Sequence, residues 1–295
     1  MARDASKGST TALGNLALAC LATSEPDPTV RSEDPVAPQL LRWSDGAAAA
    51  ARIRALHPII RRAVERLIPG IYGYGLARVH HMDRILRHEV SAGIDALVIL
   101  GAGYDTRAYR IRDLAELRVY EVDHPATSRE KQSRIAKALK STPTNVTFVE
   151  ADLARQDLLE LLADHGHERS SRTLFLLSGV SMYLSAEGMA KLFDQVAAHT
   201  SERTSLLFDY VDANVFTEPD LYYGKEWLSY AAKAGEKPGW GIPEGEAGAL
   251  LAANGLRLTS ALDARELEAR YLRGGDGSTV ARPFEFGAIA HATVA

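Results

Sequence analysis

Cysteine is nearly absent from this sequence, which contains one cysteine, Cys20, in 295 residues. A single thiol excludes an internal disulfide framework and a cysteine-rich zinc site, and it suits a reducing compartment. Cys20 follows Leu13, Leu16 and Ala17 at helical spacing. We therefore interpret it as a packing residue and not as a nucleophile.

The chain also lacks an excess of positive charge and long apolar runs. The chain carries 34 Lys and Arg against 38 Asp and Glu, a formal net charge of -4, whereas nucleic-acid binders concentrate basic residues on one surface. The one basic cluster, Arg52 to Arg66, is typical of the exposed face of an amphipathic helix. No apolar run approaches the roughly 20 residues that span a bilayer, and no signal-peptide pattern begins the chain. We expect no nucleic-acid partner, no membrane contact and a cytoplasmic protein.

Apolar residues are plentiful, at 46% of the chain, which is enough for a large buried core. From residue 96, short apolar runs alternate with helix-patterned segments, which predicts βαβ units and a parallel sheet with helices on both faces. The predicted strands are Ala96–Leu100, Leu117–Val122, Val146–Val149, Thr173–Leu177 and Ser205–Tyr210. Two further runs, Leu256–Leu262 and Phe284–Val294, predict a terminal hairpin joined by a loop that contains RGGDG.

A turn with two glycines follows the first predicted strand, where doubly wound sheets bind their ligands. A dinucleotide-binding turn would read G-x-G-x-x-G, but Thr106 replaces the third glycine after Gly101 and Gly103. Asp105 places a carboxylate where a pyrophosphate would approach. A positively charged ligand fits better, and S-adenosylmethionine carries a sulfonium and an ammonium.

The ends of the next two predicted strands supply further polar groups. Glu121 and Asp123 end the second strand, about 20 residues beyond the glycines, where an acid binds ribose hydroxyls. Asp152 and Leu153 follow the third strand. There the Asp152 carboxylate can accept the adenine amino group and the Leu153 N–H can donate to the ring.

We expect one domain over residues 1–295. Residues 1–90 form a helical arm and cap, in which residues 1–45 are the arm and lie over another part of the molecule. Residues 47–90 are helical, with interruptions near Pro58 and at Pro69–Gly75. Residues 91–210 form the cofactor-binding core. Residues 211–245, with many aromatic residues and glycines, form a lid and substrate insertion, and residues 246–295 form the C-terminal hairpin of the sheet.

Four motifs in order resemble the leucine carboxyl methyltransferase family of class I S-adenosylmethionine-dependent methyltransferases. They are LGAGYDTRAYR, VYEVDHPAT followed by Lys131, ADL and FLLSGVSMYLSAEG. The segment GYGLARVHHMD resembles the one in which that family carries a basic residue ahead of the first motif. The likeness extends from about Thr11 to Ala290 and points to the bacterial branch that includes polyketide carboxyl O-methyltransferases.

This resemblance implies a Rossmann-like fold with a seven-stranded, mostly parallel sheet, and it assigns cofactor contacts. Arg78 pairs with the methionine carboxylate, because a guanidinium can form two parallel hydrogen bonds to the two carboxylate oxygens. Asp123 binds the ribose hydroxyls. The other implied contacts are Gly101 at the methionine moiety, Gly103 at the cofactor, and Asp152 and Leu153 at the adenine.

One position departs from the family pattern. Ser178 stands where the family usually has an acid after the fourth strand, and a serine offers no full charge to the cofactor's ammonium. Either cofactor binding is weaker, another acid such as Asp105 substitutes, or the activity has drifted.

The reaction that we favour is O-methylation of a small carboxylic acid, of secondary-metabolite or polyketide type. A carboxylate with a pKa near 4 is ionised at neutral pH and needs no general base. A phenol or alcohol acceptor would need one, for which His80, His81 and His124 are the weak candidates. A cofactor-binding homologue without turnover is a further alternative, an NAD-dependent oxidoreductase is disfavoured by Thr106, and no metal site is expected.

Aromatic residues could line an acceptor pocket with hydroxyl handles. We select as substrate-binding candidates Tyr72, Tyr74, Tyr210, Tyr222, Tyr223 and Trp227, with Phe216 and Trp240 beside them.

Overall fold

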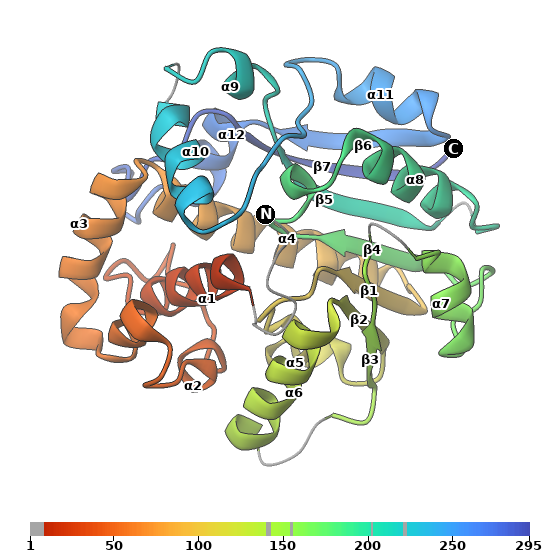
Figure 1. Ribbon diagram of the computed structural model, residues 1–295, viewed down its shortest axis with the longest axis horizontal. Coiled ribbons are helices and arrows are strands. Elements are labelled where there is room, and N and C mark those ends of the chain that lie inside the picture. The colour runs from red at the N-terminus through yellow and green to blue at the C-terminus, as the bar shows by residue number, and fades with distance from the viewer. Residues whose placement is uncertain (1–8, 140–142, 154–155, 202, 221–222) are drawn as a thin grey trace.

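The computed structural model describes residues 9–139, 143–153, 156–201, 203–220 and 223–295. Its centre is a seven-stranded sheet in the order β3-β2-β1-β4-β5-β7-β6 (Figure 1). All neighbouring strands are parallel except that β7 runs antiparallel to β5 and β6. The strands are β1 (Ala96–Leu100), β2 (Arg118–Asp123), β3 (Val146–Glu150), β4 (Thr173–Leu177), β5 (Ser205–Val211), β6 (Leu256–Leu262) and β7 (Gly287–Val294). The predicted seven-stranded, mostly parallel sheet is confirmed.

The strand positions follow from the apolar runs. Every residue of β1 and β4 is buried, as expected for central parallel strands covered on both faces. The predicted ranges of β1 and β4 match the observed ones, and those of β2, β3 and β5 differ by one residue at one or both ends.

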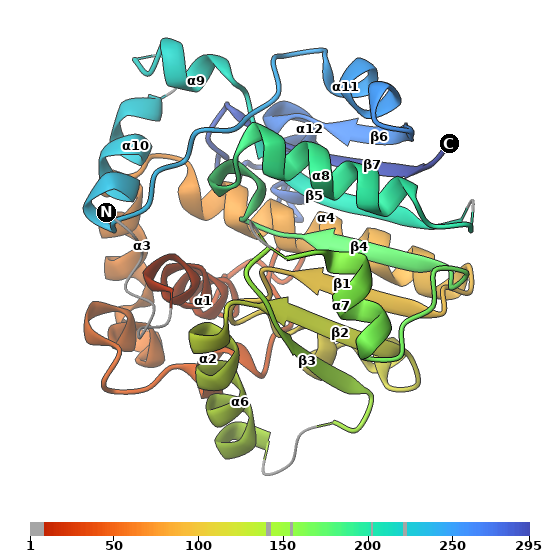
Figure 2. The same ribbon diagram turned by 45° about the vertical axis from the view of Figure 1, so that its right-hand side comes forward.

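Helices cover both faces of the sheet (Figures 1 and 2). On one face, α4 (Ile71–Ser91) and α12 (Ala264–Tyr271) share an apolar cluster with Leu97 and Ile99 of β1. On the other face, α7 (Leu158–Asp164), α8 (Ala186–Ala197) and α11 (Ala247–Ala253) share a second apolar cluster with Val98 and Leu100 of β1. The remaining helices are α1 (Thr10–Ala22), α2 (Ala37–Leu40), α3 (His57–Leu67), α5 (Arg107–Arg110), α6 (Pro125–Leu139), α9 (Asn214–Thr217) and α10 (Gly224–Lys233), with short 3₁₀ helices at Gly46–Arg52, Arg54–Leu56, Arg112–Leu114 and Ser181–Tyr183.

The N-terminal arm forms a third apolar cluster. Leu16 and Cys20 of α1 pack there with Leu40 of α2, Tyr104 from the glycine turn and Ile135 of α6. Figure 2 shows α1 beyond the carboxyl ends of β1 and β2. The arm therefore lies over the turn that the sequence marks as the ligand site, and Cys20 is the buried packing residue that was predicted.

Two local features differ from the predictions. The predicted interruption at Pro69–Gly75 is wrong in its second half, because α4 already includes Gly73. A Cβ on Gly73 would lie 2.2 Å from the Arg282 carbonyl oxygen, so this glycine permits close packing instead of ending a helix. The connection between β6 and β7 contains α12 as well as the predicted loop, and a capping box of Asp263 and Glu266 starts that helix.

Candidate functional site

The glycine turn after β1 adopts a backbone that favours glycine. Gly101 and Gly103 have φ angles of 62° and 46°, in the left-handed region. The Gly101 N–H donates to the Val122 carbonyl oxygen of β2 at 2.8 Å. A Cβ on Gly101 would lie 2.7 Å from Val180. The turn is thus pressed between the ends of β2 and β4.

Asp123, at the end of β2, holds this turn. Its Oδ2 accepts from the Gly103 N–H at 2.5 Å and its Oδ1 accepts from the His124 N–H at 2.6 Å. Glu121, the other predicted acid, is buried inside the strand and pairs with the Lys131 Nζ at 2.8 Å. Burial raises the pKa of the Glu121 carboxyl. Asp123 is therefore the acid of this strand that lies at the turn.

The predicted adenine contacts lie beside Asp123. The Ala151 N–H donates to the Asp123 carbonyl oxygen at 2.8 Å, which joins the ends of β2 and β3. The Asp152 N–H donates to the Gln156 side-chain oxygen at 2.8 Å. Leu153 packs half-buried against the apolar cluster of α7 and α8. Three sequence-predicted elements thus meet at the carboxyl edge of the sheet.

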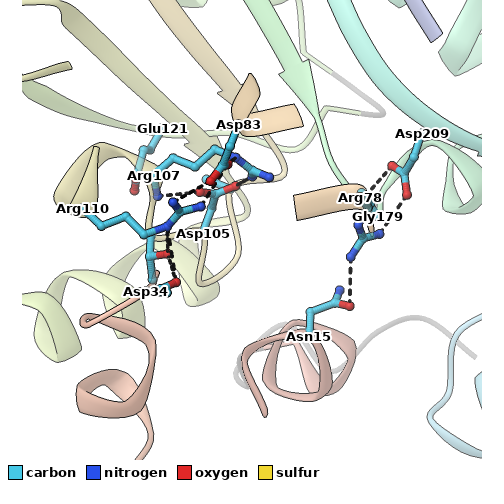
Figure 3. Close-up of polar contacts among 12 residues, drawn as sticks. Asn15, Asp34, Arg78, Asp83, Asp105, Arg107, Arg110, Glu121, Gly179 and Asp209 are labelled. Atoms are coloured by element: carbon cyan, nitrogen blue, oxygen red, sulfur yellow. Dashed lines mark hydrogen bonds and ion pairs between the residues drawn. The ribbon is translucent and has the colours of Figure 1, made fainter. Parts of the chain in front are cut away.

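Arg78, on α4, lies in a buried polar cluster (Figure 3). Its Nη1 donates to the Asp209 Oδ2 at 2.8 Å, its Nη2 donates to the Asn15 Oδ1 at 3.2 Å, and its buried Nε has no hydrogen-bond partner among the described residues. Burial by itself lowers the pKa of the Arg78 guanidinium, but the Asp209 carboxylate raises it above its ordinary value. The guanidinium is therefore charged.

Asp209 belongs to β5 and is fully buried. Its Oδ1 accepts from the Gly179 N–H at 2.6 Å. Gly179 directly follows Ser178, which is half-buried at the end of β4. The carboxylate that lies next to position 178 is therefore that of Asp209.

Asp105 belongs to a second charged cluster, seen at the left of Figure 3. Its side chain contacts the Arg107 guanidinium, which also pairs with Asp83 of α4 at 2.8 Å. Arg110 links Asp83 to Asp34 of the arm, with nitrogen–oxygen distances of 2.6 and 3.4 Å. Burial alone would raise the pKa of the Asp105 carboxyl. The positive charges of Arg107 and Lys131 lower it by more than that, so the net shift is downward. This cluster ties the arm, α4 and the glycine turn together.

Helix α1 closes over the turn. A Cβ on Gly103 would lie 3.2 Å from the Ala12 Cβ, and one on Gly179 would lie 3.3 Å from the Asn15 Nδ2. The start of α1 is fixed in turn to the chain after α10, because the hydroxyls of Ser9 and Thr11 donate to the Glu236 carboxylate. The arm and the insertion are thereby joined above the glycine turn.

The substrate-binding candidates do not gather in one place. Tyr74 lies at the Arg78 cluster, with its hydroxyl 3.5 Å from the Asp209 Oδ2, and its ring stacks on Phe284. Tyr72 donates instead to Glu25 of the arm, and Tyr210 is buried on the opposite face of the sheet. The three remaining candidates lie elsewhere: Trp227 packs on Phe286 in the core, Tyr223 is 63% exposed, and Tyr222 lies outside the described residues.

The histidines near the predicted mouth have structural partners. His81 is buried, its Nδ1 lies 2.8 Å from the Tyr271 hydroxyl, and burial lowers its pKa to about 4. The His80 Nε2 lies 2.8 Å from the Val30 carbonyl oxygen. His124 Nδ1 accepts from the Ala126 N–H at 3.4 Å. Within the described ranges, no group of three His, Cys, Asp or Glu side chains could hold a metal, and no helix is long and apolar enough to cross a membrane.

Two residues of the site were not predicted. Asp209 has the same sequence pattern as Asp123, an acid near the carboxyl end of an apolar strand. This pattern would have been enough to identify Asp209 as a candidate. Asn15 lies in a largely apolar helix, α1, and only the docking of α1 brings it to Arg78.

The chain is similar to known proteins in sequence and in fold. A family model described as leucine carboxyl methyltransferase matches residues 12–197. A Bacillus subtilis protein named "Putative S-adenosyl-L-methionine-dependent methyltransferase YktD" is 34% identical over 164 residues, which are 55% of this chain and 54% of that protein. A Mycobacterium tuberculosis protein named "Putative S-adenosyl-L-methionine-dependent methyltransferase" is 33% identical over 145 residues, 49% of this chain and 45% of that protein.

The chain therefore spans about half the length of these curated relatives. A solved structure of a "putative methyltransferase" from Thermobifida fusca shares the fold, with a TM-score of 0.60 at 16% identity, and the likeness covers 93% of this chain and 97% of that one. The family match includes more than half of the 295 residues, among them Arg78, the glycine turn, Asp123 and Ser178. The chain belongs to the leucine carboxyl methyltransferase family, and both curated relatives carry the name "Putative S-adenosyl-L-methionine-dependent methyltransferase".

Proposed function

We propose that this protein is an S-adenosylmethionine-dependent O-methyltransferase that converts a carboxylate of a small organic acid into a methyl ester. The observation that carries the proposal is the meeting of the glycine turn, Asp123 and Asp152 at the carboxyl edge of the sheet, within the segment that the family model matches. We include cytoplasmic location and a small-molecule acceptor in the same proposal.

The residues of the site suit this cofactor. Gly101 and Gly103 adopt the left-handed backbone of a tight turn after β1, and the unpartnered Nε of Arg78 is a donor for a carboxylate. When bound, S-adenosylmethionine supplies an activated methyl group on its sulfonium. Arg78 would hold the methionine carboxylate and Asp123 the ribose hydroxyls, and Asp152 with Leu153 would hold the adenine.

A carboxylate acceptor needs no base from the protein, because it is ionised well below neutral pH. The rival acceptor, a phenol or alcohol, needs a base within reach of its proton. His81 is buried with a lowered pKa of about 4, and His80 is bound to the arm. These engagements support the carboxylate. We place the acceptor on the side of Tyr74 and residues 211–245, where orientation in line with the methyl group is the main catalytic task.

Calorimetric titration with S-adenosylmethionine, S-adenosylhomocysteine and NADH tests the cofactor. We expect both sulfur nucleosides to bind and NADH not to bind. Asp123→Ala should abolish binding, whereas Asp164→Ala, which removes the same charge from an exposed position of α7, should not change it. Binding of neither nucleoside would contradict the proposal.

A panel of carboxylic acids and phenols with labelled cofactor then tests the acceptor. We expect label in a base-labile ester that releases methanol in alkali, at a rate that is flat between about pH 6 and 8 because the acceptor stays ionised. Label only in alkali-stable ethers, at a rate that falls on substitution of a histidine, would favour the hydroxyl acceptor. Cofactor binding without transfer to any acceptor would favour a homologue without turnover.

A further inference from the structure

We propose that the buried Arg78–Asp209 ion pair recognises the zwitterionic amino-acid tail of the cofactor, with Asp209 supplying the negative charge that Ser178 lacks. This inference rests on the proposed function, because it presupposes that S-adenosylmethionine binds at the glycine turn. It names which chemical group of the cofactor each partner of the pair would contact.

Asp209 lies next to Ser178 in the structure. Its carboxylate is fully buried on β5, which is the neighbour of β4 in the sheet. Its Oδ1 accepts from the Gly179 N–H at 2.6 Å, and Gly179 directly follows Ser178. The negative charge missing from position 178 is therefore present one strand away, at the same end of the sheet. Asp209 also lies beyond residues 12–197, the segment that the family model matches.

The Arg78 guanidinium has donors that a carboxylate could still bind. Its Nη1 is bound to Asp209 at 2.8 Å, whereas its Nη2 is bound only to the neutral amide oxygen of Asn15 at 3.2 Å and its Nε has no partner among the described residues (Figure 3). A carboxylate at the Asn15 side would form a stronger, charge-assisted bond. Asn15 thus occupies the position where we place the carboxylate of the cofactor.

The charge balance of the Arg78–Asp209 pair favours a zwitterionic ligand. Arg78 and Asp209 neutralise each other in a buried setting, where an extra unpaired charge would be costly. A tail that brings one carboxylate to Arg78 and one ammonium to Asp209 adds no net charge. A ligand with only the carboxylate would leave the cluster with an excess negative charge. The pair therefore selects a zwitterion over either single ion.

Asp105, the acid that the sequence suggests as a substitute, is committed elsewhere. It contacts Arg107, which shares Asp83 with Arg110. Figure 3 shows this cluster apart from the one around Arg78. Asp209 is the acid adjacent to position 178, and Asp105 is not.

A ligand series on the unaltered protein tests the inference. We would compare S-adenosylhomocysteine, its analogue with hydrogen in place of the α-amino group, and methylthioadenosine, which lacks the whole tail. Loss of one charge-assisted hydrogen bond should weaken the deamino analogue by about 10- to 100-fold relative to S-adenosylhomocysteine. Equal affinities of these two ligands would overturn the inference and leave the proposed function standing. Binding of no ligand in the series would overturn both.

Variants then test whether Asp209 contacts the ammonium of the cofactor or only positions Arg78. In Asp209→Asn, the preference for S-adenosylhomocysteine over its deamino analogue should disappear, while affinity for methylthioadenosine stays unchanged and shows that the nucleoside site is intact. Adding Ser178→Glu to that variant should restore the preference. If Asp209→Asn weakens both tailed ligands equally and keeps the preference, Asp209 only positions Arg78 and the inference is wrong. If the variant does not fold, the ligand series on the unaltered protein decides.

Discussion

The charged cluster behind the glycine turn gives the sharpest prediction of stability. Asp83 of α4 pairs with the Arg107 Nε at 2.8 Å and with the Arg110 Nη1 at 2.6 Å. All three side chains are at most 9% exposed. Burial alone would raise the pKa of the Asp83 carboxyl. The two arginines lower it by more than that, so the group is ionised at neutral pH. Asp83→Asn therefore removes a buried negative charge from two cations.

Removal of one partner from a buried ion pair costs about 3–5 kcal/mol, because the other charge stays buried. Here Arg107 keeps Asp105 and Arg110 keeps Asp34. We therefore expect the lower end, a loss of about 3 kcal/mol in the free energy of unfolding, and a fall of the melting temperature by about 6–12 °C. Urea titration followed by circular dichroism measures the first quantity and calorimetry the second.

Asp95→Asn is the matched control, since it removes the same charge from another arginine. Asp95 and Arg172 pair at 3.1 Å, with their side chains 40% and 36% exposed. Water screens this pair, so the loss should stay below about 1 kcal/mol. An equal loss in the two variants would refute the reasoning, because burial of the cluster would then contribute nothing.

Two further predictions concern pH and packing. Between about pH 6.5 and 4 the native state binds fewer protons than the unfolded state, so the free energy of unfolding should fall on acidification by up to about 1.4 kcal/mol per pH unit per histidine. The groups responsible are three buried histidines whose pKa burial lowers to about 4, namely His81, His167 and His291. Urea titrations at pH 7 and 5 check this, and stability that does not change between them would contradict it. In α4, Gly73→Ala should destabilise by about 2 kcal/mol or more, because its Cβ would lie 2.2 Å from the Arg282 carbonyl oxygen. Gly75→Ala, whose Cβ would meet only Leu18 at 3.7 Å, should be neutral or stabilising by up to about 1 kcal/mol, and equal melting temperatures of the two variants would refute the packing argument.

The difference between Asp123 and Asp209 shows how far sequence reasoning reaches. Asp123 follows a strand that the sequence places about 20 residues after the glycines, so a known geometry identifies it. Asp209 has the same local pattern, an acid near the end of an apolar strand. Its significance depends on Arg78, which is 131 residues away in the chain. Contacts of this range are a property of how α4 docks on the sheet.

The aromatic candidates show the opposite limit. Tyr72 and Tyr74 are two residues apart on α4, yet one binds Glu25 of the arm and the other lies at Arg78. Composition places both in an apolar setting, but the helical rotation of about 100° per residue sends them in different directions. Only the packing around each side chain separates a core tyrosine from one at the site.

The sequence by itself determined the sheet, the glycine turn and the acid at the end of β2, because alternating apolar runs and glycine backbone preferences act locally. Tertiary structure decided what surrounds them. It placed Asn15 of α1 on Arg78, joined Arg78 to Asp209 and committed Asp105 to Arg107. Those outcomes depend on which charges share a buried space, and buried charges must find partners wherever the fold brings them.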